Sequence, residues 1–99
     1  MYEMLVGLEV IDDQIYQRYR EAMWPVLESY GGEFGYDFRV SEVLKNESEE
    51  DINRVFTIRF PTEKAQESFF ADTDYQAVKA EFFDASVKSI NIIAGYAKP

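Results

Sequence analysis

The spacing of apolar residues changes repeatedly along this chain, and these changes limit its fold more than any other feature. Between residues 2 and 11, apolar side chains recur at every second position, which is typical of a strand with one buried face. From residue 14 to residue 30 they recur every three or four residues, which predicts a helix of about four turns. Asp12 is the candidate N-cap and Gly31 the stop signal. Because Pro25 lies inside the helical pattern, we expect a kink or a break near it.

The second half of the chain returns to a period of two and then repeats the helical spacing. Residues 33–44 and 52–60 alternate again, and the polar, acidic stretch between them predicts an exposed turn that joins two strands. Thr62 begins a helical region that Asp72-Thr73-Asp74 divides into two pieces. The isoleucine-rich segment 87–96 predicts a closing strand.

The order of elements is therefore β-α-β-β-α-β, which predicts a ferredoxin-like α+β fold. Two βαβ halves joined by a hairpin give a four-stranded antiparallel sheet with both helices on one face. A chain of 99 residues fits a single domain over residues 1–99. Because the helices cover only one face of the sheet, we expect the other face to meet water or another molecule.

The absence of two residue types excludes several kinds of site. The sequence contains no cysteine and no histidine, which rules out thiolate nucleophiles, cysteine-ligated clusters, histidine-ligated haem and serine–histidine triads within this chain. We therefore expect neither a metal site nor a cofactor.

The net charge of −9 disfavours nucleic acid and anionic membranes as partners. The first residues show no signal-peptide pattern, and no apolar run approaches the roughly 20 residues of a membrane span, so we expect a cytoplasmic protein.

Short motifs spread over nearly the whole chain point to a known family. They are Tyr16-Gln17-Arg18-Tyr19 with Pro25 and Tyr30-Gly31-Gly32, the segment from Arg54 to Pro61, and Phe69-Phe70 with Asp74-Tyr75-Gln76-Ala77. Together they resemble the family of unknown function numbered thirteen-thirty, which belongs to the dimeric α/β-barrel superfamily. The resemblance implies a homodimer whose two sheets pack face to face around a cavity. The superfamily includes antibiotic-biosynthesis monooxygenases, muconolactone isomerases and ligand-sensing domains, so the resemblance does not fix a chemistry.

Strand alternation predicts a set of polar side chains on the sheet face away from the helices: Glu9, Asp37, Arg39, Thr57 and Arg59. In a cavity between two such sheets, this set can contact a small organic ligand. A guanidinium offers two parallel donors to a carboxylate or enolate, which makes Arg39 and Arg59 the candidate charge stabilisers. Apolar surroundings raise the pKa of an aspartate, which makes Asp37 the candidate general base. Glu9 and Thr57 are the candidate ligand contacts.

Other interpretations of the same residues stay open. The charged side chains can simply pair across neighbouring strands or face water. Trp24 stands beside Pro25 at the edge of the apolar stripe, where it is a candidate for the mouth of a pocket. The leading hypothesis is a homodimer that binds a small organic molecule, with cofactor-free isomerase or monooxygenase-like activity as its enzymatic form. The alternative is a non-catalytic ligand-sensing or structural dimer, in which bulky side chains such as Leu5, Val55 and Ile93 fill the space between the sheets.

Overall fold

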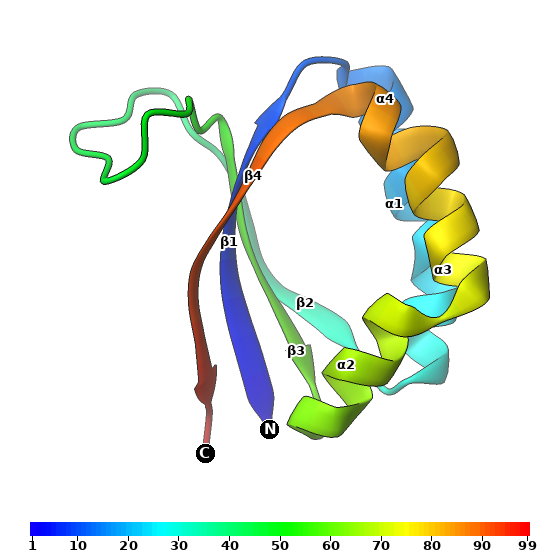
Figure 1. Cartoon of the computed structure of the whole chain (residues 1–99). Helices are drawn as coiled ribbons and strands as arrows, with labels where there is room; N and C mark the ends of the chain where they lie inside the picture. The colour runs from blue at the N-terminus through cyan, green and yellow to red at the C-terminus, as the bar shows by residue number, and fades with distance from the viewer.

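The computed structural model describes residues 1–99 and shows strands and helices in the order that the sequence predicts (Figure 1). The second helical region is divided into short pieces, one of which is a π-helical turn. The elements are β1 (Tyr2–Val10), α1 (Asp13–Ser29), β2 (Glu33–Arg39), β3 (Arg54–Phe60), α2 (Glu63–Ala71), α3 (Thr73–Val78), the π-helical turn η1 (Lys79–Phe83), α4 (Asp84–Ser86) and β4 (Val87–Ala97).

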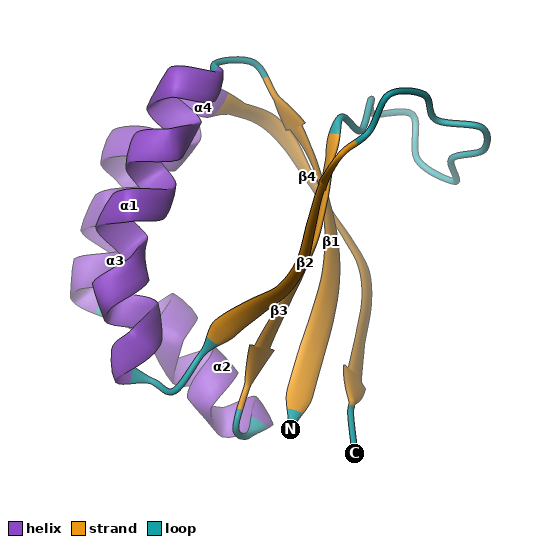
Figure 2. Ribbon diagram, turned by 180° about the vertical axis from the view of Figure 1, so that it is seen from behind, coloured by secondary structure: helices purple, strands orange, loops and turns teal.

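The four strands form one antiparallel sheet in the order β2-β3-β1-β4. All the helices lie on one side of this sheet, and the long loop between β2 and β3 projects toward the other side (Figure 1, Figure 2). The arrangement confirms the expected α+β, ferredoxin-like architecture. We call the uncovered side of the sheet, which carries Leu5, Val55 and Thr57, the open face.

Side-chain caps begin the two main helical regions where the sequence predicts them. A side-chain oxygen of Asp12 accepts a hydrogen bond from the backbone N–H of Ile15 at 3.0 Å, at the start of α1. The hydroxyl of Thr62 accepts one from the backbone N–H of Ala65 at 3.0 Å, at the start of α2. Each cap satisfies a backbone donor that the first turn of a helix leaves free.

Of the kink or break expected near Pro25, the break does not occur: α1 continues through this residue to Ser29. The strands on either side of the long loop are shorter than predicted: β2 ends at Arg39 and β3 begins at Arg54. No helix in the structure combines the length and the apolar character that crossing a bilayer requires.

The core lies between the sheet and the helices, where the even-numbered residues of β1 meet the apolar stripe of α1. Leu8 and Leu27 are completely buried there, and Phe60 and Phe69 close the end near α2 with ring centroids 5.5 Å apart. Burying these large side chains is the main favourable contribution to the folding of a domain of this size. The core fixes the sheet against α1 and α2, and the candidate site lies beside it.

A β-bulge in β2 reverses the direction in which the later side chains of this strand point. Phe34 lies opposite Ile58, and Asp37 lies opposite Phe56, so three steps along β2 match two steps along β3. Because side chains alternate along a strand, the extra residue places Asp37 on the same face as Phe34. The backbone can approach β3 closely here because Gly35 has no side chain: an added Cβ would lie 2.6 Å from the hydroxyl oxygen of Thr57.

This bulge shows that the predicted positions of two candidate site residues are wrong. Asp37 and Arg39 lie on the side of the helices and not on the open face. The open face instead receives Tyr36 and Phe38, which are 62% and 55% exposed. Their rings stack on each other with centroids 5.7 Å apart. The four residues from Tyr36 to Arg39 therefore lie on the opposite side of the sheet from the one that a simple alternation predicts.

Candidate ligand-binding cavity

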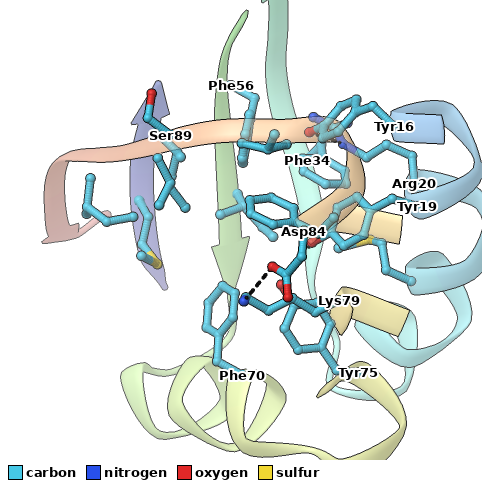
Figure 3. Close-up of a pocket in the computed structure, with 18 of the residues that line it drawn as sticks. Tyr16, Tyr19, Arg20, Phe34, Phe56, Phe70, Tyr75, Lys79, Asp84 and Ser89 are labelled. Carbon is cyan, nitrogen blue, oxygen red and sulfur yellow. Dashed lines mark hydrogen bonds and ion pairs between the residues drawn. The ribbon is translucent and has the colours of Figure 1, made fainter. Parts of the chain in front are cut away.

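A cavity of about 500 Å³ lies between the sheet and the helices, next to the core (Figure 3). Strands β1, β3 and β4 supply one wall, and α1, α3 and η1 supply most of the other. Fourteen of its 20 lining residues are hydrophobic, as is usual for sites that bind small organic molecules. Ile90 and Ile92 of β4 face this cavity and remain about half exposed, so it opens to solvent along β4.

Aromatic rings form the wall on the helix side. Tyr16 and Tyr19 of α1 stack with ring centroids 5.6 Å apart, and Phe83 of η1 meets Tyr19 edge-on at 5.1 Å. Phe56 of β3 lines the opposite side. Ring faces and edges contact flat apolar molecules favourably, so this wall suits an aromatic or polycyclic ligand better than a strongly hydrated one.

Two buried tyrosines provide the polar group inside this apolar cavity. The hydroxyl oxygens of Tyr19 and Tyr75 are 2.9 Å apart, and both rings lie in the wall (Figure 3). Burial raises the pKa of both phenols, so both remain protonated at neutral pH. A pair of phenols uses only one of its two protons in the bond between them. The second proton is available to a ligand oxygen, and the pair therefore acts as a hydrogen-bond donor rather than as a base.

An ion pair between Lys79 and Asp84 adds charge to the lining, with a distance of 3.1 Å from the ammonium nitrogen to the carboxylate oxygen (Figure 3). The two residues are five positions apart, a spacing at which side chains of an α-helix do not face each other. Here η1 is π-helical, and the backbone N–H of Asp84 donates to the carbonyl of Lys79. The wider turn brings the two side chains to the same side. A π-helical turn inside a helix often marks a functional region.

Asp37 lies in a charged cluster beside the cavity. It accepts hydrogen bonds from Arg54 through Nε and Nη2, both at 2.8 Å, and pairs with Arg20 at 3.2 Å. Partial burial opposes ionisation, but the hydrogen bonds from Arg54 and the charge of Arg20 hold the pKa of Asp37 below its usual value. The raised pKa that the sequence analysis expected is therefore wrong. An ionised carboxylate held by two guanidiniums is a weak base, so the arrangement gives the predicted role of Asp37 as general base no support.

The other sequence-predicted residues do not meet in one site. Arg59 lies on the open face and pairs with Glu33 at 2.8 Å. Thr57, also on the open face, is buried, and its hydroxyl accepts a hydrogen bond from the backbone of β2. Glu9 stands at the end of β1 opposite β4. Trp24 is 42% exposed and borders a shallow groove on α1, outside the cavity, and Arg39 lies opposite Arg54 at the end of β2.

The structure also identifies residues that sequence reasoning did not select. Tyr19 and Tyr75 fall on apolar helical stripes, where the sequence analysis gives no sign of a cavity. Lys79 and Asp84 carry no motif, and their pairing depends on a π-helical turn that periodicity does not reveal. No group of three or more carboxylates in the structure is arranged to hold a metal ion.

Solved structures of other proteins share this fold. A protein of unknown function from Rhodopseudomonas palustris is 20% identical, with 99% of this chain and 83% of that chain covered, at a TM-score of 0.79. A proposed antibiotic biosynthesis monooxygenase from Nitrosomonas europaea is 14% identical, with 99% and 98% covered, at 0.62. A dimeric protein of unknown function and ferredoxin-like fold from Bacteroides fragilis is 13% identical, with 98% and 95% covered, at 0.62. At these identities the likeness shows the fold alone.

Sequence comparison gives the family directly. No curated protein matches the chain. The model of a domain of unknown function, DUF1330, matches residues 4–96, which is nearly the whole chain. This match confirms the resemblance noted in the sequence, and the protein belongs to the DUF1330 family.

Proposed function

We propose that this protein binds a small, largely aromatic organic molecule that carries an oxygen acceptor, inside the cavity of each chain. The observation that carries the proposal is the Tyr19–Tyr75 pair, a protonated donor placed in the aromatic wall of a largely apolar cavity of about 500 Å³. The sequence hypothesis placed the ligand between the sheets of two chains. The cavity instead supports binding on the helix side of a single sheet.

The arrangement of polar groups gives the ligand one orientation. The phenol pair lies in the aromatic wall, while Lys88 and Ser89 line the cavity at the start of β4. A ligand with an apolar body and a single carbonyl or hydroxyl oxygen can place this oxygen at the phenols and its remaining polar groups toward solvent. Few polar groups at fixed positions in an apolar pocket are the usual basis of small-molecule specificity.

We further propose that the chain forms a homodimer through the open face. Tyr36 and Phe38 stack on this face, and Ile93 borders a groove on the same side of the sheet with 48% of its surface exposed. These exposed apolar side chains lie on both edge strands of the sheet, β2 and β4, and exposed apolar surface of this kind commonly marks a protein–protein contact. The protein from Bacteroides fragilis, which has the same fold and is described as dimeric, supports the proposal.

An enzymatic form of the same proposal is a cofactor-free isomerase or monooxygenase-like activity. The phenol pair can donate to an oxygen on which negative charge develops, as donors in oxyanion holes do. Asp84 is the only carboxylate in the cavity lining and takes the place of Asp37 as the candidate base. The proposed monooxygenase from Nitrosomonas europaea shares the fold. Saturable binding with no product favours the alternative, a ligand-sensing protein without chemistry of its own.

The test compares two aromatic probes, 2-naphthol and naphthalene, by fluorescence titration. We expect 2-naphthol to bind more tightly, because its oxygen can accept the free phenol proton. Tyr19→Phe combined with Tyr75→Phe should remove most of the difference between the probes, since the pair then has no proton to donate to the ligand oxygen. Tyr36→Phe, on the open face, is the matched control and should change neither affinity.

Two substitutions in β4 then locate the bound probe. Ile90→Trp places a large ring in the cavity and should abolish binding, whereas Ile93→Lys, on the open side, should leave it unchanged. Loss of binding in Ile93→Lys, with retention in Ile90→Trp, would place the ligand between two sheets and contradict the proposal.

A further inference from the structure

A second, strongly polar cleft lies where the first turns of α1 meet the end of β2 and the start of β3. It has a volume of about 440 Å³ and shares no lining residue with the aromatic cavity. None of its lining residues is hydrophobic: they are Asp13, Gln14, Gln17, Arg18, Arg39 and Arg54. The cleft is therefore a separate feature, which neither the family nor the proposed function accounts for.

The charge of this cleft is opposite to that of the whole protein. The chain has a net charge of −9, yet three of its five arginines line this one cleft, against a single carboxylate from Asp13. A local cluster of positive charge in an acidic protein attracts small anions while the remaining surface repels them. The cleft therefore favours an anionic ligand that is small enough to enter it.

Two of these arginines stand directly opposite each other across neighbouring strands. Arg39 of β2 pairs in register with Arg54 of β3. Like charges at such positions destabilise a sheet unless another charge compensates them. Asp37 compensates Arg54, but it also pairs with Arg20, so its single charge serves two guanidiniums. Asp13 lines the same cleft but forms no ion pair, so the guanidinium of Arg39 has no paired counter-charge.

The remaining guanidiniums are free to bind a ligand. Neither Arg18 nor Arg39 forms a side-chain hydrogen bond or an ion pair anywhere in the structure, and Arg54 is held in place by two hydrogen bonds to Asp37, both of 2.8 Å. The cleft thus combines one fixed guanidinium with two unpaired ones, contributed by three different elements. The amide of Gln14 adds a further donor.

We propose that this cleft binds a phosphate dianion, either free phosphate or the head of a phosphate monoester. Guanidiniums approaching from α1, β2 and β3 can each donate to a different oxygen of a tetrahedral anion, which a planar carboxylate does not offer. The lining carries a net charge of +2, which a dianion neutralises. Such an anion also supplies the counter-charge that the Arg39–Arg54 pair lacks.

The test is a calorimetric titration of the whole protein with inorganic phosphate. Chloride is lowered as phosphate is added, so that the ionic strength stays constant. We expect saturable binding with one phosphate per chain. Arg39→Gln should weaken it at least tenfold, because one of the three guanidiniums is lost. Lys64→Gln removes the same charge from the exposed start of α2 and should leave the affinity unchanged. A parallel titration with glycerol 3-phosphate shows whether a monoester binds more tightly than the free ion.

Thermal unfolding supplies a second readout that does not depend on binding heat. Without phosphate, Arg39→Gln should unfold at a higher temperature than the original protein, because the repulsion between Arg39 and Arg54 is relieved. At one fixed phosphate concentration, the original protein should gain clearly more stability than the variant, which binds phosphate more weakly. The proposal fails if phosphate stabilises no more than chloride, if succinate binds as tightly as phosphate, or if Lys64→Gln weakens binding as much as Arg39→Gln.

Discussion

The two phenols of the cavity illustrate how a single hydrogen bond can serve both stability and recognition. Tyr19 and Tyr75 come from α1 and α3, so their bond ties the two helices together within one wall of the cavity. Because the bond uses only one of the two protons, the pair is satisfied without a ligand and still has a donor to offer. A single phenol in the same place would have no partner until a ligand arrived.

The contribution of this pair can be measured with a double-mutant cycle. Tyr19→Phe and Tyr75→Phe should each lower the free energy of unfolding by about 1–2 kcal/mol, because each leaves the other hydroxyl buried without a partner. The double variant should cost clearly less than the sum of the two, since no orphaned hydroxyl remains. Urea unfolding measures the free energy of unfolding of the two single variants and of the double variant. Strict additivity would show that the two hydroxyls do not depend on each other.

Asp37 should make the protein sensitive to acid. Its pKa is lowered in the folded state, so the unfolded chain takes up the proton first as the pH falls. The associated stability is complete above the ordinary aspartate pKa of 3.8 and is lost as the pH falls through the lower, folded value. At pH 7, Asp37→Asn should cost about 1–2 kcal/mol through the weakened contacts with Arg20 and Arg54.

The same variant should also change the pH profile. Between pH 5 and pH 2, the free energy of unfolding should fall less steeply in Asp37→Asn than in the original protein. Glu3 and Asp72, whose pKa values are also lowered, contribute equally to both profiles and act as an internal reference. Urea unfolding at a series of pH values is the measurement, and parallel profiles would show that Asp37 is not stabilised by its arginines.

At the scale of elements, the bulge in β2 should tolerate no side chain at Gly35. In Gly35→Ala the new Cβ would meet the hydroxyl of Thr57 at 2.6 Å, and the strands must separate to relieve the contact. We expect a loss of about 1–3 kcal/mol in urea unfolding. In a Thr57→Ala background the cost of the same change should shrink. An undiminished cost there would mean that the backbone conformation, and not the contact, requires glycine.

The elements differ in how far the sequence could predict them. The order of strands and helices and the caps at Asp12 and Thr62 follow from periodicity and local hydrogen bonding, and these predictions are confirmed. The bulge in β2 and the π-helical turn η1 could not be predicted in this way. Each inserts one residue into a regular element without any change of composition, so the apolar pattern continues through it.

The candidate site was harder to predict for a related reason. The sequence singled out Asp37 and Arg39 as chemically interesting, but simple alternation placed them on the wrong face. Tyr19 and Tyr75 fall on apolar helical stripes, and such a stripe lines a packed core and an apolar cavity alike. Only the separation of the two layers in three dimensions distinguishes a core from a cavity.

At the scale of the whole molecule, the two faces of the sheet have different environments. The helix side holds the cavity, and the open face carries exposed aromatic and aliphatic side chains. Binding and assembly are therefore expected to be separable by mutation, because no residue of the cavity lining needs to change when the open face is altered.

The dimer proposal can be tested with a matched pair of isoleucines. Ile93→Lys places a charge on the open side, and we expect the dissociation constant of the dimer to rise about a hundredfold or more, as for an unpaired charge buried at an interface. Ile11→Lys changes an isoleucine at the turn before α1, 61% exposed against 48% for Ile93, and should have no effect. Sedimentation velocity over a range of concentrations measures both. A monomer in the original protein, or equal effects of the two substitutions, would contradict the proposal.

The bulge in β2 also gives the length of this strand an evolutionary meaning. Loss of a single codon at Gly35 would remove the extra residue and leave a regular strand, in which every later side chain keeps its present side. Phe38 would remain on the open face, and Asp37 and Arg39 would remain on the helix side. The bulge is therefore a means by which β2 accepts one additional codon without exchanging its assembly surface for its charged one, so that the chain can vary in length at this point while both surfaces are kept.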